Sequence, residues 1–396
     1  MSLEFNRRNF IKKTALAGAA LTLNNSIKAF SAAKKDTVRI GIIGAGFRSH
    51  EHMGNFLQRD DVTITAIADP QQRSVDEALK VFAAYKRPEP AIYKNGDFDY
   101  RNLLKRDDVD AVVICSPWEW HSIQAIDAMN AGKIVGAEVC GAVKLQECWD
   151  VVNTSEKTKI PVMMLENVCY RRDVMAVLNM VRQGIFGELI HLQGGYQHDL
   201  REVKFNDGVK AYGGGCEFGE NGFSEAHWRT QHSVHRNGDL YPTHGIGPVA
   251  HYININRGNR FINLSSFSSK PRGLHNHIVK TCGPESKNAK IEFKLGDVVA
   301  TSIKCANGET ILLQHDTNLP RPYSLGFRVQ GTEGIWMDVN KGIYIEGKSA
   351  KPHQWDEAKK WLDENDHPLW KRYGSDAQGA GHGGMDFFVI HSFIES

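Results

Sequence analysis

The sequence of 396 residues lacks the features that would place it in a specialised class of protein. It has no run of 18 or more apolar residues, so we expect no membrane-spanning helix and no membrane insertion. It has no excess of one charge, because 48 Lys and Arg stand against 46 Asp and Glu. That balance argues against nucleic acid or an acidic membrane surface as a partner. The remaining composition, with 41% hydrophobic residues, is typical of a globular protein, and the length predicts two domains.

Cysteine is scarce and scattered, and no Cys-x-x-Cys pair occurs. Several cysteines lie in apolar strand patterns, as buried thiols do. An exported protein could pair some of them, but an odd number leaves at least one free. We therefore expect no structural disulfide framework among Cys115, Cys140, Cys148, Cys169, Cys216, Cys282 and Cys305.

The first 35 residues have the layout of an export signal. A basic segment at residues 6–13 precedes an apolar run at 14–23, and small residues surround positions 29–33. The Arg-Arg-x-Phe-Ile-Lys core resembles a twin-arginine signal, a type that carries folded proteins, and a basic, disordered tail is the alternative. We therefore exclude residues 1–35 from the fold and expect an exported, periplasmic protein.

A glycine turn follows the first apolar segment of the remaining chain. Residues 40–43 run into Gly44 and Gly46, and a helical pattern begins near Ser49. Gly44 permits the tight turn, and Gly46 lets the backbone approach a pyrophosphate whose charge the helix N-terminus stabilises. Ser49 stands where G-x-G-x-x-G has its third glycine, so the fingerprint alone does not exclude a plain glycine turn.

An acidic residue supports a dinucleotide site at this turn. The second apolar strand, residues 62–68, ends at Asp69, about 23 residues after Gly46. A carboxylate in that position can accept both hydroxyls of a ribose. No Arg or Lys directly follows Asp69 to bind a 2′-phosphate, so the sequence favours NAD over NADP.

Strand and helix patterns alternate over residues 36–166 and give way to a different pattern after them. Continuous apolar runs such as residues 111–115 are typical of parallel strands buried on both faces. The repeated βαβ units predict an α/β Rossmann domain with a doubly wound parallel sheet. Residues 167–396 are rich in strand-like segments and predict an α+β domain with a largely antiparallel sheet. A long glycine-rich loop is expected at 203–227, and loops of that length are usually functional or mobile.

Aromatic and charged residues follow the ends of two further strands. The strand at 111–115 leads into Trp118-Glu119-Trp120-His121, at the edge where open sheets bind dinucleotides, although a hydrophobic loop closure is the alternative. The strand at 133–139 ends in Glu138-Val139. This layout resembles the Gfo/Idh/MocA superfamily, whose dehydrogenases place a lysine at the position of Val139 to act on the substrate hydroxyl. Val139 can neither accept a proton nor stabilise an alkoxide.

The stretch from Trp228 to Val249 closely resembles glycoside hydrolase family 109, the NAD-dependent α-N-acetylgalactosaminidases, which is a branch of that superfamily. Members of this family extend beyond a position like Ser396, so we expect a final segment to be absent. The resemblance covers nearly the whole chain after residue 35 and includes Phe47-Arg48, Leu165-Glu166-Asn167, residues 178–184 and 193–198, Arg321-Pro322-Tyr323 and Gly381-His382-Gly383-Gly384-Met385-Asp386.

The resemblance implies two sets of site residues. Those that would line NAD, beside Gly44 and Gly46, are Phe47, Arg48, Asp69, Trp118, Glu119, Trp120, His121, Glu138, Val139 and Asn167. Those that would face the sugar are Tyr196, Arg229, Tyr241, Pro242, Thr243, His244 and Tyr323. Without the family, His244 also fits a turn histidine, Tyr196 ordinary packing, and Arg229 a surface cation–π pair. Two histidine pairs, His232 with His235 and His275 with His277, have no third ligand at a familiar spacing, so no metal is expected.

The resemblance also implies an NAD-dependent hydrolysis that departs from the two-carboxylate scheme. The sugar is oxidised at C3 by tightly bound NAD⁺, the C2 proton is removed and the C1 substituent is eliminated. Water then adds, the ketone is reduced again, and configuration at C1 is retained. We assign proton transfer at the C3 hydroxyl to His244 and at C2 to Tyr196, whose pKa of about 10 would have to be lowered.

Two other functions remain open at this point. One is a net sugar oxidoreductase that releases NADH, against which Val139 argues. The other is a non-catalytic protein that binds NAD and sugar, against which the ionisable and aromatic residues at 241–244 argue. We expect a glycan or glycoside as partner, and pairing of sheets into a homo-oligomer only by analogy.

Overall fold

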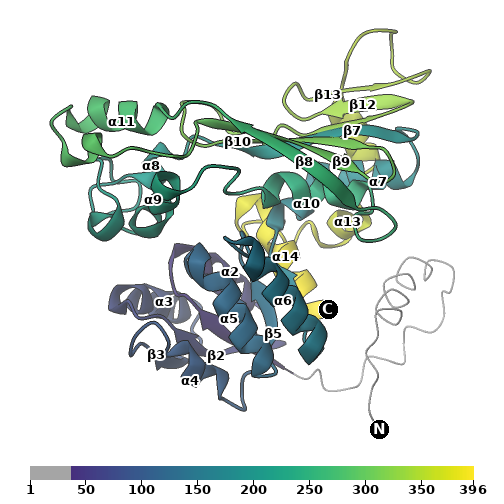
Figure 1. Ribbon diagram of the computed structural model, residues 1–396. Coiled ribbons are helices and arrows are strands. Elements are labelled where there is room, and N and C mark those ends of the chain that lie inside the picture. Colours follow the sequence, from purple (N-terminus) through teal and green to yellow (C-terminus); the bar gives the residue numbers. More distant parts are fainter. Residues whose placement is uncertain (1–36) are drawn as a thin grey trace, which may run out of the picture.

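The computed structural model describes residues 37–396, which form two domains, one below and one above in Figure 1, each built on one sheet. The export signal expected over residues 1–35 lies outside the described residues. In the described part of the chain, no helix has the length and apolar character needed to cross a membrane.

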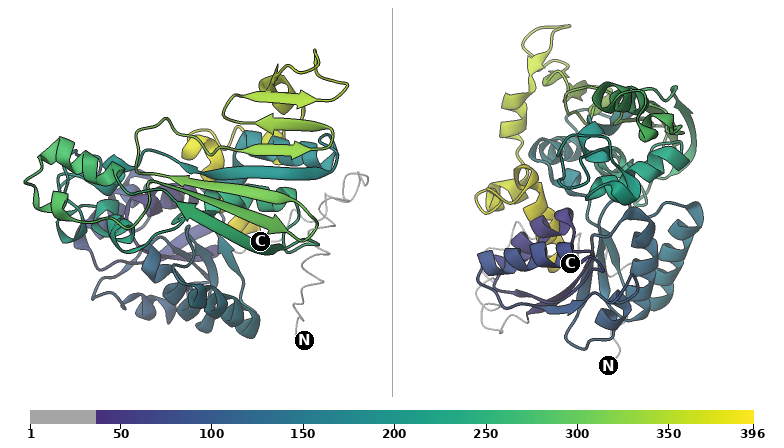
Figure 2. Two further views of the ribbon diagram at one scale, coloured as in Figure 1. Left: turned by 45° about the horizontal axis from the view of Figure 1, so that its top comes forward. Right: turned by 90° about the vertical axis from the view of Figure 1, so that its left-hand side faces the viewer.

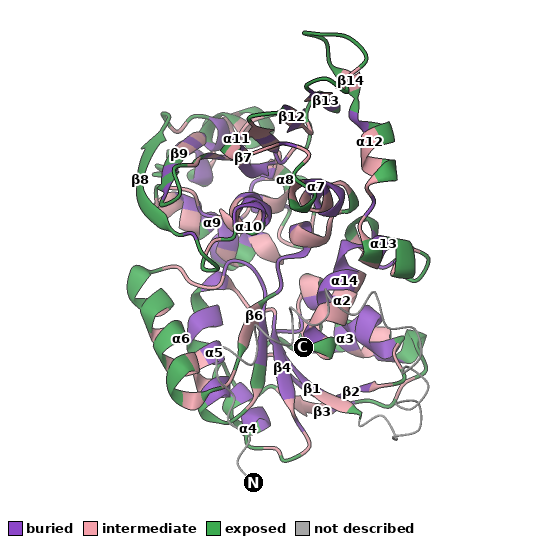
Figure 3. Ribbon diagram, turned by 90° about the vertical axis from the view of Figure 1, so that its right-hand side faces the viewer, coloured by how far each residue is buried: buried purple, intermediate pink, exposed green. Residues whose placement is uncertain are grey.

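The first domain is a Rossmann fold. Its six strands are parallel to their neighbours in the order β3-β2-β1-β4-β5-β6, the doubly wound arrangement with a switch point between β1 and β4. The predicted α/β class is confirmed, and the buried β4 is purple in Figure 3. The strands are β1 (Val38–Ile43), β2 (Val62–Ala68), β3 (Ala91–Tyr93), β4 (Ala111–Ile114), β5 (Ile134–Ala137) and β6 (Val162–Met164).

Helices cover both faces of this sheet because its strands are apolar on both sides. One core contains Phe56 and Phe82 of α2 and α3, and the other contains Leu103 and Met129 of α4 and α5. A fully buried side chain of this size contributes roughly 1.5–3 kcal/mol. The helices are α2 (Phe47–Leu57), α3 (Gln72–Ala84), α4 (Tyr100–Leu104), α5 (Trp118–Asn130) and α6 (Leu145–Thr158).

The last helix of the chain returns to the first domain. Val389, Ile390 and Phe393 of α14 (Met385–Glu395) are buried in the same core as α2 and α3. A Cβ on Gly136 of β5 would lie 3.1 Å from the Phe393 ring, so this glycine leaves room for it. The apolar segment at residues 387–394 is therefore a helix that completes the NAD-side core, and Figure 1 shows it in yellow against α2.

The second domain is built on an eight-stranded sheet in the order β14-β13-β12-β11-β7-β10-β9-β8. Only the pair β7 and β10 is parallel, which confirms the predicted, largely antiparallel sheet. Figure 2 shows this sheet from two further sides, and the edge strand β8 is exposed along its whole length (green in Figure 3). The strands are β7 (Leu189–Gln197), β8 (Phe261–Ser268), β9 (Val298–Cys305), β10 (Thr310–Asp316), β11 (Arg328–Gly331), β12 (Gly334–Met337), β13 (Gly342–Ile345) and β14 (Asp356–Glu357).

Helix α10 packs directly on strand β7 of this sheet, and glycines determine how closely the two elements approach. A Cβ on Gly245 of α10 would lie 2.5 Å from the Gly195 nitrogen of β7, and one on Gly194 would lie 2.7 Å from the Gly245 carbonyl oxygen. No other residue type fits at such a close approach. The helices of this domain are α7 (Arg172–Arg182), α8 (Arg201–Lys204), α9 (Glu225–His235), α10 (Thr243–Tyr252), α11 (Gly273–Cys282), α12 (Ala358–Glu364) and α13 (Pro368–Tyr373), with short 3₁₀ turns η3 (Asn167–Tyr170), η4 (Gly219–Asn221), η5 (Lys287–Lys290) and η6 (His382–Gly384).

One disulfide corrects the expectation for the cysteines. Cys216, in the loop between α8 and α9, is bonded to Cys282 at the end of α11, 66 residues away. The remaining five cysteines are free. Periodicity could not reveal this pair, because the two cysteines meet only when the loop folds onto α11.

Candidate active site

The glycine turn has the geometry that a pyrophosphate requires. Gly44 has a φ of +91°, and a Cβ there would lie 2.5 Å from the Ser116 nitrogen at the end of β4. Gly46 precedes α2, and nothing lies within 4 Å of where its Cβ would be, so the turn is open to the cavity. Asp69 supports the turn, since its Oδ2 accepts a hydrogen bond from the Ala45 N–H at 2.7 Å. Each Asp69 oxygen accepts one backbone N–H and keeps capacity for a ribose hydroxyl. The residues therefore fit NAD.

Arg48, whose side chain is 23% exposed, and the buried Glu138 form an ion pair where α2 meets the end of β5. Arg48 Nε donates to Glu138 Oε1 at 2.7 Å, and His52, one helical turn further on, contacts the same oxygen at 2.5 Å. Burial alone would raise the pKa of Glu138, but the Arg48 charge and the His52 hydrogen bond hold it at about 2. Glu138 also accepts the Val139 N–H at 3.1 Å. The predicted pair Glu138-Val139 is thus a fixed negative charge beside a buried apolar side chain.

Asp386 ties the end of the chain to these cofactor residues. Its carboxylate is fully buried and accepts two hydrogen bonds from Arg48, at 2.8 and 2.9 Å, and one from Asn167 Nδ2, at 2.8 Å. His382 Nδ1 lies 2.8 Å from Asp386 Oδ2. Despite its burial, the His382 and Arg48 partners hold the pKa of Asp386 well below its ordinary value. The Gly381–Asp386 motif therefore positions two residues that were predicted to line NAD.

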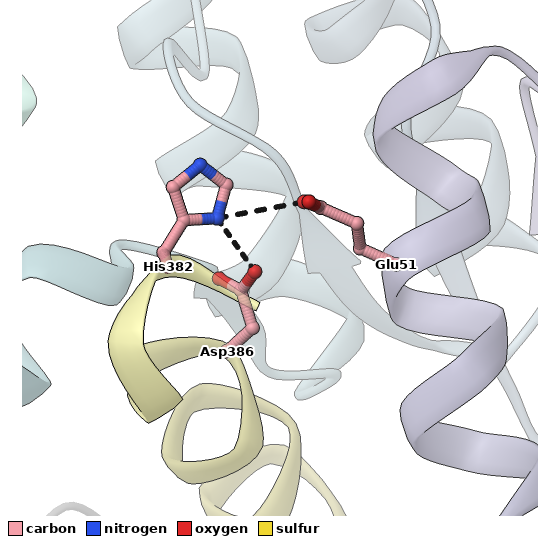
Figure 4. Close-up of side chains that lie close together, drawn as sticks. All are labelled: Glu51, His382 and Asp386. Carbon is pink, nitrogen blue, oxygen red and sulfur yellow. Dashed lines mark hydrogen bonds and ion pairs between the residues drawn. The ribbon is translucent and has the colours of Figure 1, made fainter. Parts of the chain in front are cut away.

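One group of described residues has the composition of a metal site. Ligand atoms of Glu51, His382 and Asp386 lie within 4.8 Å of one another, and Figure 4 shows them facing each other from α2 and the end of the chain. Arg48 Nη1, however, lies 2.5 Å from Glu51 and 2.8 Å from Asp386. A guanidinium already supplies the positive charge, so we interpret the group as an ion-pair network.

The Trp118-Glu119-Trp120-His121 motif forms the first turn of α5. Trp118 is buried and packs against Trp228 and Tyr241 of the second domain, with ring centroids 5.1 and 5.5 Å apart. Glu119 Oε2 lies 3.2 Å from His232 Nε2. The buried His121 ring has its two nitrogens 2.9 Å from the Cys140 oxygen and 2.7 Å from the Ser116 oxygen, and so joins the ends of β5 and β4. This turn therefore connects the two domains.

His244 is oriented by a carboxylate, that of Glu166, which the sequence analysis did not assign to either set of site residues. Its Nδ1 lies 2.7 Å from Glu166 Oε1, which also accepts the Val168 N–H at 2.9 Å. Since a carboxylate oxygen accepts, Nδ1 carries the proton, and Nε2 is the nitrogen available as a base. Glu166 follows β6 as Asp69 follows β2, and this position at a strand end is the signal that could have identified it.

Tyr196 lies beside His244 at the end of β7, and their ring centroids are 5.1 Å apart. Its hydroxyl is 3.4 Å from His198 Nδ1. Burial raises the pKa of Tyr196 to about 12, although the Arg229 charge opposes the shift. The pKa therefore moves away from the lowered value that the sequence-based mechanism requires. In the protein alone, Tyr196 is a neutral phenol.

Arg229 lies in an aromatic cage between the domains. Its Cζ is 5.0 Å from the centroid of the Trp118 ring and 5.1 Å from that of Tyr241, and Nη1 forms an ion pair with Glu225. The Arg229 side chain is 9% exposed, so it is not the surface pair that the alternative interpretation proposed. Tyr241 packs at 4.8 Å from both Tyr196 and His244.

A single cavity of about 1790 Å³ brings the two predicted sets of residues together. It is lined by every predicted cofactor residue from Gly44 to Asn167 and by Tyr196, Arg229, Tyr241, His244 and Tyr323. Pro242 and Thr243 are not among its lining residues and lie at the start of α10, where the Pro242 oxygen accepts the Ile246 N–H at 2.8 Å. They directly precede His244 in the chain and do not line the cavity.

Family models match both halves of the chain. The model of the NAD-binding Rossmann fold of the oxidoreductase family matches residues 38–165, and that of the glycosyl hydrolase 109 C-terminal domain matches residues 170–396, more than half of the chain. The chain belongs to glycosyl hydrolase family 109. This family-109 enzyme is a glycosidase, and NAD is its cofactor.

Named relatives and solved structures agree with this assignment. A glycosyl hydrolase family 109 protein of Stenotrophomonas maltophilia is 53% identical over 98% of this chain and 86% of its own length. An alpha-N-acetylgalactosaminidase of Tannerella forsythia is 49% identical over 100% of this chain and 88% of its own. A levoglucosan dehydrogenase in complex with NADH has a TM-score of 0.62 at 20% identity and covers 91% of this chain and 89% of its own, which shows a shared fold.

Proposed function

We propose that this glycosidase removes terminal α-linked N-acetylgalactosamine with retention, and that NAD is regenerated in every turnover. The observation that carries the proposal is the contact of His244, held by Glu166, with Tyr196 in the cavity that also contains the glycine turn. The name of the Tannerella forsythia relative and that of a 40% identical Shewanella oneidensis relative, both alpha-N-acetylgalactosaminidases, support the sugar.

Each residue has one task in this scheme. NAD, which the glycine turn and Asp69 would hold, would supply the reversible hydride acceptor for C3. His244 Nε2 accepts the proton of the C3 hydroxyl, and the Glu166 carboxylate stabilises the imidazolium that results. Tyr196 accepts the C2 proton, which the C3 ketone has made acidic. This requires the Tyr196 pKa to fall below the value of about 12 that it has in the protein alone, and the Arg229 charge already acts in that direction.

A net sugar oxidoreductase is the second candidate, since the chain shares its fold with dehydrogenases. Val139 argues against it. Its side chain is buried and apolar, and its backbone N–H is held by Glu138, so it offers no proton acceptor where those enzymes use a lysine.

One assay separates the two candidates. Incubation with an aryl α-N-acetylgalactosaminide in deuterated water should release the phenol, incorporate deuterium at C2 of the sugar and leave no accumulated NADH. NADH formed in proportion to product would favour the oxidoreductase. The variants His244→Ala and Tyr196→Phe should each lose most of the turnover, and normal rates in both would end the assignment.

We also propose that the enzyme is exported as a folded, NAD-loaded protein to the periplasm. The twin-arginine core at Arg7 and Arg8 supports this, and so does the Cys216–Cys282 disulfide, because such bonds persist in oxidising compartments. Replacement of both arginines by lysine should retain the protein in the cytoplasm. Unchanged periplasmic activity of that variant would contradict the proposal.

A further inference from the structure

A loop of the second domain lies over the end of the cavity where Asp69 is found. The loop runs from Phe205 to Ser224, between α8 and α9, which Figure 1 shows above α3. Its tip and its returning arm both line the cavity, through Lys210, Ala211, Tyr212, Gly222, Phe223 and Ser224. The facing side belongs to the first domain and consists of Asp69, Gln71, Arg73, Ser74 and Glu77.

Arg73, in the first turn of α3, holds both arms of this loop. Its Cζ lies 3.8 Å from the centroid of the Phe223 ring, a close cation–π contact. Its Nη2 donates to the Val209 carbonyl oxygen at 3.0 Å. One guanidinium of the NAD-binding domain therefore fastens the outgoing and the returning arm of a loop that belongs to the other domain.

The base of the same loop is fastened in a second way. Cys216 is 3% exposed, lies in a small apolar core with Phe205 and Phe218, and is bonded to Cys282 of α11. Asn206 and Glu217 also exchange backbone hydrogen bonds across the loop, at 3.1 and 2.8 Å. Neither cysteine lines the cavity. The disulfide therefore affects only how the loop is anchored.

We propose that the segment Phe205–Ser224 is a strap that retains NAD by closing over its adenosine half, beside Asp69. This inference rests on the part of the proposed function in which NAD is regenerated in place. A cofactor that is reoxidised in each cycle has no need to leave, so a closed entrance does not slow turnover. A strap held by Arg73 and by the disulfide must open before NAD dissociates, and that opening slows the dissociation.

The test compares nucleotide retention in the full-length enzyme and its variants. Arg73→Ala and Phe223→Ala each remove one partner of the cation–π contact between the domains. Cys282→Ser removes the disulfide that anchors the loop. Lys80→Ala, on the exposed side of the same helix, is the matched control. NAD per chain is measured after gel filtration and acid release, and the dissociation rate is measured with excess labelled NAD. We expect wild type and Lys80→Ala to retain NAD, and the three other variants to lose it at least about tenfold faster.

Arg73 lines the cavity, so a direct contact with NAD must be told apart from an action through the strap. If Arg73 acts through Phe223, the double variant that carries both Arg73→Ala and Phe223→Ala loses NAD no faster than either single variant. Reduction of the wild-type disulfide should also accelerate the loss. Faster NAD dissociation in Arg73→Ala alone, with unchanged dissociation rates in Phe223→Ala and Cys282→Ser, would overturn the proposal. Unchanged NAD dissociation rates in all variants would overturn it as well. A wild-type enzyme that retains NAD but releases no phenol would refute the hydrolase and leave the strap intact.

Discussion

His244 receives its orientation from Glu166, a residue 78 positions earlier in the chain. The carboxylate keeps the proton on Nδ1 and stabilises the imidazolium that forms when Nε2 accepts a proton. Glu166→Gln preserves the size of the side chain and removes its charge. We expect kcat to fall about 100-fold with little change in KM, because the charge matters most after proton transfer.

Steady-state kinetics with the aryl glycoside measures this effect. Glu156→Gln, on the exposed face of α6, is the matched control and should keep wild-type rates. A Glu166→Gln variant with normal kcat would show that His244 does not need the carboxylate.

Asp239 is a residue whose burial has a consequence for stability. Burial raises its pKa from 3.8 to about 6, although the Tyr241 N–H bonds to one of its oxygens, and the other oxygen has no partner. Between these two pH values the folded state binds more protons than the unfolded state, so the free energy of unfolding falls as pH rises from about 4 to 6. The difference amounts to about 3 kcal/mol.

Asp239→Asn should remove this part of the pH dependence and stabilise the protein at pH 7. Denaturant unfolding of both proteins at pH 4, 5, 6 and 7 measures the difference. Parallel stability curves for the variant and the wild type would refute the prediction.

At the scale of elements, the contact of α10 with β7 determines the catalytic geometry. Gly194 and Gly245 let the helix lie directly on the strand, which brings His244 to Tyr196. Alanine is a better helix former than glycine, so a propensity argument alone predicts that Gly245→Ala stabilises α10. The added Cβ would instead lie 2.5 Å from the Gly195 nitrogen and force the helix away.

We expect Gly245→Ala to cost about 1–3 kcal/mol in stability and to lower kcat at least about tenfold. Gly194→Ala should act in the same way, since its Cβ would meet the Gly245 carbonyl oxygen at 2.7 Å. Thermal unfolding and kinetics of the two variants measure this. A stabilised and fully active Gly245→Ala variant would contradict the close-packing argument.

At the scale of the whole molecule, the helix α14 packs on the first domain although it follows the second domain in sequence. Helix α14 buries Phe393 against Gly136 and places Asp386 beside Arg48. Phe393→Ala should lower the free energy of unfolding by about 3–5 kcal/mol, because it leaves a cavity in the core of the NAD-binding domain. Phe267→Ala, at an exposed site on β8, is the control and should change stability by less than about 0.5 kcal/mol.

Denaturant unfolding with and without added NAD measures this prediction. NAD binds only the folded first domain, so it should recover part of the stability that Phe393→Ala loses. Equal stability of the two phenylalanine variants would show that α14 is not part of that core.

Local patterns were sufficient for the features that depend on neighbours in the chain. Alternating apolar runs predicted the Rossmann sheet, and the glycine turn with Asp69 predicted its NAD site. The residues that the family resemblance assigned to the NAD and sugar sites also line one cavity, apart from Pro242 and Thr243.

Partners far apart in the chain were decided only by the tertiary structure. The bonds of Glu166 to His244, Asp386 to Arg48 and Cys216 to Cys282 join residues 78, 338 and 66 positions apart. Local periodicity records which face of a strand or helix is apolar, and it contains no information about which distant polar group will lie opposite. The rise in the Tyr196 pKa has the same origin, because the burial that raises it, like the Arg229 charge that opposes it, exists only once the chain has folded.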